Sequence, residues 1–363
     1  MIKNEFMSNL KKPFPNEVFI DTIKGRHPAN KILPIKTSSG WVWDAKRGYH
    51  FKNKCRLCDS SALLIFKESK DKPYDGNVFC EFSAPKALYR KNNISGILFE
   101  DRTILYDKVK ELTVNNGINI DIAEIPVDFR VFDVTRIDLS FSFFPVDKTE
   151  QEEFLRLFKI MYHPYLKPGK LCKKDYDYPN AFAFTSNKLD IVLYDKAKEF
   201  GLEDIHMLRL EFRCKKPAKG FGVGSDYFDS VENSFKKGNK WLANKLERYN
   251  FCLPFVPEDE YTKAIIKCYK TKKAEHTTSS EAKPSYLTYK LPTLIKTVQE
   301  INSCGCHAYH SLNRIMYNDC LQLAKDAGVQ ILYTGLTYPI SFIDNVCYHE
   351  EAEMLAEYAS IPP

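Results

Sequence analysis

Three strand-like segments with alternating polar and apolar residues constrain the fold of this chain most strongly. They are VTRIDLSFSF (134–143), LDIVLYDKAKEF (189–200) and LRLEFRCK (208–215). All three are rich in β-branched and aromatic residues and lack Pro and Gly, as strands do. Since alternate residues of a strand face the same side, Asp138, Tyr194 and Glu211 each lie on a face opposite an apolar one.

The polar faces combine residue types that suit phosphodiester chemistry. Two carboxylates can hold a hard divalent cation, a tyrosine can attack a phosphodiester, and cationic side chains can bind phosphates. The residues alone leave structural alternatives open. Tyr194 is also a candidate half-buried strand aromatic, Asp138 a candidate partner of Arg136 or Arg209, and Glu211 a candidate partner of its flanking arginines.

Composition bounds the class of protein only broadly. The chain has 363 residues, 44% hydrophobic and 28% charged, which is typical of a globular protein with one large domain or two. The net charge of +6 is compatible with binding to nucleic acid, but many soluble enzymes have a similar charge. No apolar run reaches the length of a membrane span, and the first residues lack the apolar core of a signal peptide. We therefore expect a cytoplasmic protein without a membrane partner.

The 11 cysteines are expected to be reduced thiols. Cys55 and Cys58, together with Cys304, Cys306 and His307, are candidate zinc ligands, but neither group has a second pair at finger spacing. Ordinary buried or surface thiols are the alternative.

The order of elements predicts an α+β fold. Strands and amphipathic helices follow one another in a way that favours an antiparallel sheet with helices on one face and an open catalytic face. Apolar spacing predicts a helix over 102–116, and Thr149 with Glu152 predicts a capping box at the start of the next helix.

We expect a nuclease domain over 1–269, a polar linker over 270–285, and a small helical C-terminal domain over 286–363. Its two predicted helices, 291–302 and 312–327, are a candidate DNA-reading pair or a simple helical hairpin.

Four blocks of sequence carry a resemblance to a known family. The segment VFCEFSAPKALYRKNNISG (78–96) contains a glutamate, then S-x-P-K-x-L, then an asparagine and a glycine. The three strand segments above follow it in order. In this pattern the chain resembles the replication initiators of filamentous phages, the gene II/X protein family. The likeness runs from about residue 60 to 235 and continues more loosely through 284–350. The N-terminus departs from the family: VFIDTIK (18–24) is the candidate for the family's opening strand, which usually starts nearer the first residue.

The resemblance implies roles for individual residues. It implies Tyr194 as the catalytic nucleophile. Lys196 is a candidate catalytic residue that would stabilise the phosphate, or it simply neutralises Glu199. Asp138, Glu211 and Glu81 are the implied ligands of Mg²⁺ or Mn²⁺, since both metals prefer oxygen. The cations expected to contact DNA are Lys86, Arg136, Arg209 and Arg213.

The expected function is initiation of rolling-circle replication of a phage or plasmid. The protein would nick one strand of a double-stranded origin through a 5′-phosphotyrosine link and later rejoin the displaced strand. Its expected partners are origin DNA, double-stranded and single-stranded, and the helicase and polymerase of a bacterial host. The alternative is a non-catalytic protein that binds single-stranded nucleic acid, in which the acidic residues are structural.

Overall fold

The structure, a computed structural model, describes most of the central and C-terminal parts of the chain. The described residues are 20–30, 41–44, 48–51, 55–57, 60–68, 75–89, 97, 101–115, 133–161, 166–168, 181–199, 205–215, 238, 240–278, 282–305 and 314–343. The expected features at Lys86 (its side chain), Cys58, Cys306 and His307 lie outside them.

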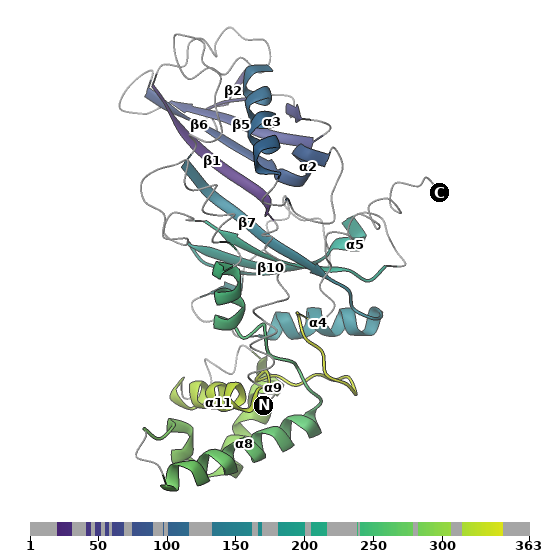
Figure 1. The fold of residues 1–363 in the computed structure, drawn as a ribbon, viewed down its shortest axis with the longest axis vertical. Helices are drawn as coiled ribbons and strands as arrows, with labels where there is room; N and C mark the ends of the chain where they lie inside the picture. Colours follow the sequence, from purple (N-terminus) through teal and green to yellow (C-terminus); the bar gives the residue numbers. More distant parts are fainter. Residues whose placement is uncertain are drawn as a thin grey trace.

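The described part contains one antiparallel sheet of 11 strands. The strands are β1 (Ile20–Asn30), β2 (Trp41–Asp44), β3 (Gly48–Phe51), β4 (Cys55–Leu57), β5 (Ser60–Glu68), β6 (Asp75–Ser83), β7 (Asp133–Phe143), β8 (Lys167–Pro168), β9 (Phe182–Thr185), β10 (Leu189–Asp195) and β11 (Leu208–Cys214). Their order is β2-β3-β5-β6-β1-β7-β11-β10-β9-β8, with β4 paired to β5. The sheet therefore places β7, β11 and β10 side by side, as Figure 1 shows.

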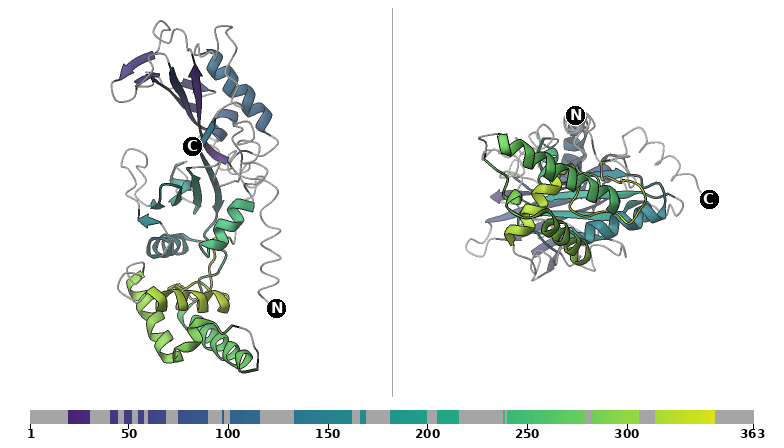
Figure 2. Two further views of the ribbon diagram at one scale, coloured as in Figure 1. Left: turned by 90° about the vertical axis from the view of Figure 1, so that its left-hand side faces the viewer. Right: turned by 90° about the horizontal axis from the view of Figure 1, so that it is seen from below.

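The labelled helices pack on different parts of this sheet and extend beyond its end. They are α2 (Ala84–Tyr89), α3 (Arg102–Asn115), α4 (Lys148–Ile160), α5 (Lys196–Glu199), α8 (Glu258–Thr278), α9 (Leu291–Cys304) and α11 (Arg314–Ala327), with a 3₁₀ turn, η2 (Ser285–Thr288). The molecule is elongated, with the sheet at one end, α8, α9 and α11 at the other, and α4 between them (Figures 1 and 2). The α+β class is confirmed.

The apolar faces of the central strands build the core, as their alternation predicts. Ile137, Leu139, Phe141 and Phe143 of β7 are all buried. Helix α4 packs on this side, where the rings of Phe143 and Phe154 meet edge to face with centroids 5.0 Å apart. The opposite, polar face is therefore the one that carries the candidate site.

Two local expectations about helices need correction. A capping box of Thr149 and Glu152 was expected to open α4, but Asp147 is the N-cap and accepts from the Glu150 N–H at 2.8 Å. The Glu150 carboxylate in turn accepts from the Val146 N–H at 2.8 Å. The helix is still capped by a side chain, but at Asp147 instead of Thr149. Asp is at least as favourable an N-cap residue as Thr.

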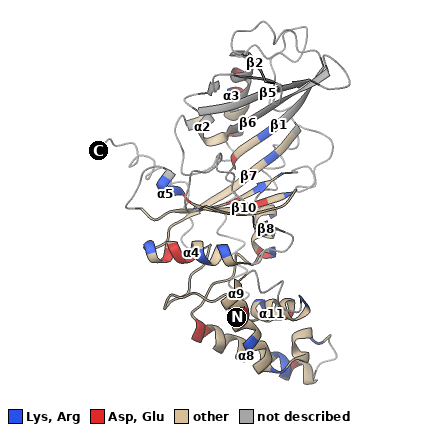
Figure 3. Cartoon of the chain, turned by 180° about the vertical axis from the view of Figure 1, so that it is seen from behind, with Lys and Arg blue, Asp and Glu red and all other residues tan. Residues whose placement is uncertain are grey.

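The linker expected over 270–285 is wrong for residues 270–278, which form the last turns of α8. The acidic first turn of α8 and the lysines that follow it are visible in Figure 3. Lys272 pairs with Glu275 at 2.9 Å, and the Tyr269 hydroxyl donates to the Tyr289 carbonyl at 2.7 Å. Lys, Ala and Glu are good helix formers, so a polar stretch without apolar periodicity continues the helix. How the chain divides into folding domains stays a prediction.

Candidate active site

The sheet register brings the three key residues of the polar face together on neighbouring strands. Tyr194 of β10 lies opposite Arg209 of β11, and Arg213 of β11 lies opposite Asp138 of β7. Glu211 stands between these two arginines on β11. Tyr194, Glu211 and Asp138 thus form a diagonal line across three adjacent strands, each a diagonal neighbour of the next. Such neighbours lie within reach of long side chains.

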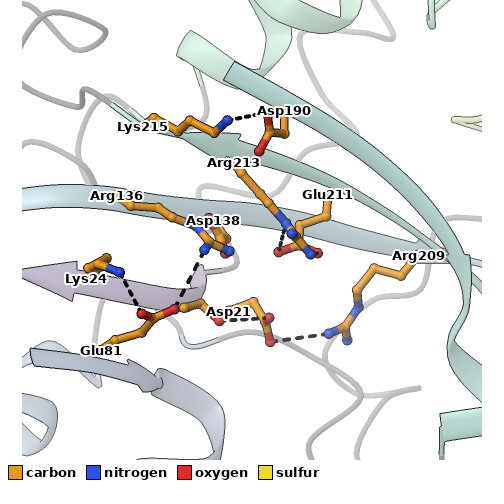
Figure 4. A network of polar contacts seen from close by, with 11 residues as sticks. Asp21, Lys24, Glu81, Arg136, Asp138, Asp190, Arg209, Glu211, Arg213 and Lys215 are labelled. Carbon is orange, nitrogen blue, oxygen red and sulfur yellow. Dashed lines mark hydrogen bonds and ion pairs between the residues drawn. The ribbon is translucent and has the colours of Figure 1, made fainter. Parts of the chain in front are cut away.

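Both carboxylates of this line are buried and held by arginines two residues away (Figure 4). Asp138 is 0% exposed and Glu211 is 2% exposed. Arg136 donates from Nε to Asp138 Oδ1 at 2.7 Å and from Nη2 to Oδ2. Arg213 donates from Nε and Nη2 to the two oxygens of Glu211, each at 3.2 Å. Each bond pair is a two-pronged arginine–carboxylate contact, the strong and geometrically specific form.

Burial disfavours ionisation of both carboxyl groups. Burial raises the pKa of Glu211 well above its ordinary value, and the negative charges of Asp138 and Asp21 raise it further. Burial raises the pKa of Asp138 too, although Arg136 opposes the shift. A buried carboxylate beside another resists charge. Arg136 and Arg213 supply positive charge to this pair.

A second cluster on β1 and β6 continues the polar face. Lys24 Nζ lies 2.8 Å from Glu81 Oε2, and Arg136 Nη1 lies 3.7 Å from Glu81 Oε1. Arg136 therefore bridges Glu81 and Asp138 (Figure 4). The Arg136 side chain is 24% exposed, whereas the side chains of Arg209 and Arg213 on β11 are 1% and 11% exposed.

Asp21 of β1 is a site residue that the sequence reasoning missed. Its Oδ1 accepts from Arg209 Nη1 at 3.4 Å, and Arg209 also donates from Nε to Ser142 Oγ at 3.2 Å. Asp21 is the extra residue of a β-bulge, because Ile20 pairs with Leu139 while Thr22 already pairs with Asp138. Bulges often redirect a side chain near functional sites. Simple alternation puts Asp21 and Thr22 on opposite faces of the strand, so the sequence gives no signal for this placement.

Tyr194 lies in a small apolar cluster on the polar face, separate from the main core. The cluster contains Ala181, Ala183 and Val192, and all four residues are buried. Lys196, the first residue of α5, is also buried, and its Nζ lies 5.9 Å from the centre of the Tyr194 ring. The structure therefore places a cation beside the expected nucleophile.

The expected cation ligands do not form a ready metal site. Within the residues that the structure describes, no three His, Cys, Asp or Glu side chains converge in a way that could hold a metal ion. The oxygens of Asp138 and Glu211 instead face guanidinium groups, and Glu81 faces Lys24. Carboxylate oxygen suits Mg²⁺ or Mn²⁺, but this arrangement does not fit one until the arginines move.

The arginines expected to contact DNA occupy different environments. Arg209 and Arg213 are buried within the face, and Arg136 is partly exposed. Lys86 belongs to α2. Contact of these residues with DNA stays a prediction.

Comparisons with known proteins give little beyond this geometry. No protein-family model matches the chain, and no curated protein matches it. A solved structure of a rolling circle replication initiator protein from Geobacillus stearothermophilus is similar at a TM-score of 0.29 and 9% identity. The similarity covers 63% of this chain and 84% of that one. A likeness of this size carries no argument here, so the function is argued from the residues.

Among the described residues, no helix is both long and apolar enough to cross a membrane.

Proposed function

We propose that this protein initiates rolling-circle replication by nicking one strand of an origin with Tyr194 as the nucleophile. The observation that supports the proposal is the diagonal of Tyr194, Glu211 and Asp138 on one face of adjacent strands, with Arg209 opposite the tyrosine. A tyrosine, paired carboxylates and arginines on one face are the groups that phosphodiester transfer requires. The resemblance to the gene II/X family supplies the reaction.

In the proposed reaction the Tyr194 oxygen forms a bond to the phosphorus as the phenol gives up its proton. The bond from phosphorus to the 3′ oxygen breaks, and the leaving oxygen takes a proton to become a 3′ hydroxyl. Lys196, whose Nζ lies 5.9 Å from the centre of the tyrosine ring, and Arg209, the cross-strand partner of the tyrosine, supply positive charge for the phosphate. The phosphotyrosine link conserves the bond energy, so the same group can later rejoin the displaced strand.

The 3′ hydroxyl would then serve as primer for a host polymerase, with a host helicase opening the duplex. The resemblance also implies that the reaction depends on Mg²⁺ or Mn²⁺. Its implied ligands are Asp138, Glu211 and Glu81. A divalent cation would neutralise charge on the scissile phosphate.

One observation favours the second candidate, a non-catalytic protein that binds single-stranded nucleic acid. The charges of Asp138, Glu211 and Arg209 are buried, and each is paired with an opposite charge, as in a structural network. The partners are Arg136, Arg213 and Asp21. The two functions differ in whether a covalent bond to DNA forms.

The test is therefore a covalent adduct. The purified protein is incubated with supercoiled DNA of the replicon that encodes it, or with single-stranded fragments of that replicon, and run on denaturing gels. We expect an adduct with the wild-type protein and none with Tyr194→Phe, which keeps the ring and should keep DNA binding.

Tyr338→Phe is the matched control, because Tyr338 is exposed and lies in the C-terminal segment. It should form the adduct normally. An adduct with Tyr194→Phe would show that the nucleophile is another residue. DNA binding without any wild-type adduct would favour the non-catalytic candidate.

A further inference from the structure

Helix α11 packs through one side and exposes the other. Its buried apolar residues recur at the spacing of one helical face and are Tyr317, Cys320, Leu323 and Ala324. The first turns of the opposite side carry Arg314, Ile315 and Asn318, and all three are exposed. Asn318 lies four residues after Arg314 and three after Ile315, so the three side chains are neighbours on the helix surface. The exposed side therefore combines a guanidinium, an apolar group and an amide.

This combination of side chains suits the edges of DNA bases. Arg can form two hydrogen bonds to guanine O6 and N7, and Asn can form two to adenine N6 and N7. An apolar side chain can contact the methyl group of thymine. All of these base groups lie in the major groove, which is wide enough to admit an α-helix. A helix that reads DNA contacts bases mainly with its N-terminal residues, and Arg314, Ile315 and Asn318 lie at that end of α11.

Two exposed lysines flank the segment that borders α11. Ser285 and Tyr286 of η2 donate hydrogen bonds from their hydroxyls to carboxylates of α11, so η2 lies along one edge of the helix. Lys283 precedes η2 and Lys290 follows it, and both are exposed. Cations beside a helix that lies in a groove can contact the phosphates at the groove edge.

The central sheet is less suited to reading a base sequence. Arg136, Arg209 and Arg213 of the sheet each pair with a carboxylate, so their donors are already engaged. Helix α11 lies at the end of the elongated molecule away from the sheet (Figures 1 and 2). Recognition of a duplex and attack on one strand can therefore use different surfaces.

We infer that α11 reads the base sequence of duplex DNA in the major groove through Arg314, Ile315 and Asn318. Lys283 and Lys290 hold the phosphates beside the groove. The inference rests on the proposed function, because an origin is the sequence that a replication initiator has to find. It assigns sequence preference to α11 and leaves strand attack to the sheet. Base contacts carry the preference, whereas phosphate contacts strengthen binding to any sequence.

The test compares the binding of the full chain to duplexes of different sequence. Labelled duplex fragments that tile the replicon encoding the protein are titrated by fluorescence anisotropy at one fixed salt concentration, since phosphate contacts depend on salt. The fragment that binds most tightly is then compared with a duplex of the same composition in shuffled order. We expect the wild type to prefer the replicon fragment, since specific complexes are typically tighter by roughly 10³-fold or more.

Variants of α11 test the base contacts. Arg314→Ala and Asn318→Ala should each lower the preference for the replicon fragment by about 5- to 150-fold, the range for loss of one two-pronged base contact. Gln299→Ala is the matched control, because Gln299 is an exposed amide on the neighbouring helix α9. It should keep the full preference. All three side chains are exposed, and circular dichroism checks that each variant is folded.

Variants of the lysines test the phosphate contacts. Lys283→Gln and Lys290→Gln should weaken binding to both duplexes alike. Each should also lower the slope of log affinity against log salt concentration by about 0.9. Lys267→Gln is the matched control, because Lys267 is an exposed lysine of α8 outside the segment that borders α11. It should leave the slope unchanged.

A modified duplex tests the groove. N7 of guanine and adenine lies in the major groove, and 7-deazapurines lack this acceptor. We expect the wild type to lose its preference for the replicon fragment when its purines are replaced in this way. Arg314→Ala should lose less, because one of its N7 contacts is already absent.

The inference is wrong if the wild type binds all duplexes equally, or if Arg314→Ala and Asn318→Ala both keep the wild-type preference. A full preference for the 7-deazapurine fragment would also overturn it. The adduct test on single-stranded fragments is independent of these outcomes. An adduct without sequence preference refutes only reading by α11, whereas a preference that Asn318→Ala removes, without any adduct, refutes only the nicking reaction.

Discussion

Phe342→Ala is expected to destabilise the sheet although residue 342 lies after α11 in the chain. The Phe342 side chain is 0% exposed. Its ring centroid lies 5.1 Å from that of Phe251, 5.2 Å from Phe154 of α4 and 5.8 Å from Phe143 of β7. The C-terminal segment therefore completes the core beneath the strands that carry the site.

The magnitude follows from the burial. Phe→Ala in a core costs about 3–5 kcal/mol, the sum of lost transfer free energy and the cavity that remains. Collapse around the cavity is restricted, because Phe255 pairs with Ile340 through the backbone and the Glu153 carboxylate accepts from the Gly335 N–H at 2.7 Å. The upper part of the range is therefore expected. The free energy of unfolding of a native protein is typically about 5–15 kcal/mol, so the variant would lose a large fraction of its stability.

The assay is urea unfolding at equilibrium, followed by tryptophan fluorescence and far-ultraviolet circular dichroism. Trp241 reports on the core, because its ring lies 6.5 Å from that of Phe212 of β11. Ile315→Ala is the control, since Ile315 is 63% exposed, and should change the free energy of unfolding by less than about 0.5 kcal/mol. If Phe342→Ala lowers the free energy of unfolding by less than about 1 kcal/mol, Phe342 is not a packed part of this core. The same packing predicts that a chain ending near residue 270 will not keep a stable sheet.

Two further predictions concern carboxylates. Burial alone would raise the pKa of Glu153, but hydrogen bonds from Arg156 and the Gly335 N–H lower it below its ordinary value of 4.5. Its stabilisation is thus present above pH 4.5 and lost as pH falls through the folded pKa, so Glu153→Gln should flatten the acid limb of a stability–pH curve; an unchanged limb contradicts this. Asp138→Asn and Glu211→Gln should each raise the Mn²⁺ concentration needed for origin cleavage, and identical metal titrations would show that these carboxylates are structural.

The sequence predictions that the structure confirms were made from strand alternation and helix periodicity. The strands containing Asp138, Tyr194 and Glu211 lie where their β-branched and aromatic residues predict, and their apolar residues are buried. The helix expected over 102–116 is α3, Arg102–Asn115. A period of two residues is a local property, so the face that each of these side chains occupies follows from the sequence.

The polar faces expected to be open carry charges that are buried. From the sequence, the arginines around Glu211 are equally compatible with DNA contact and with a structural ion pair. Only the register of β7 against β11 decides that Arg213 lies opposite Asp138, and only packing decides that Glu211 is removed from water. Both depend on contacts between segments far apart in the chain.

The strands, their polar faces and the residue types of the candidate site follow from local sequence patterns, because strand alternation and residue chemistry are local. The pairing of charges depends on contacts between distant segments. Asp21 reaches Arg209 through a bulge that exists only because β1 pairs with β7 out of step by one residue. Phe342 joins the core only because the chain returns to the sheet after α11. The energies of these contacts belong to pairs of distant residues, and no pattern within a single segment encodes them.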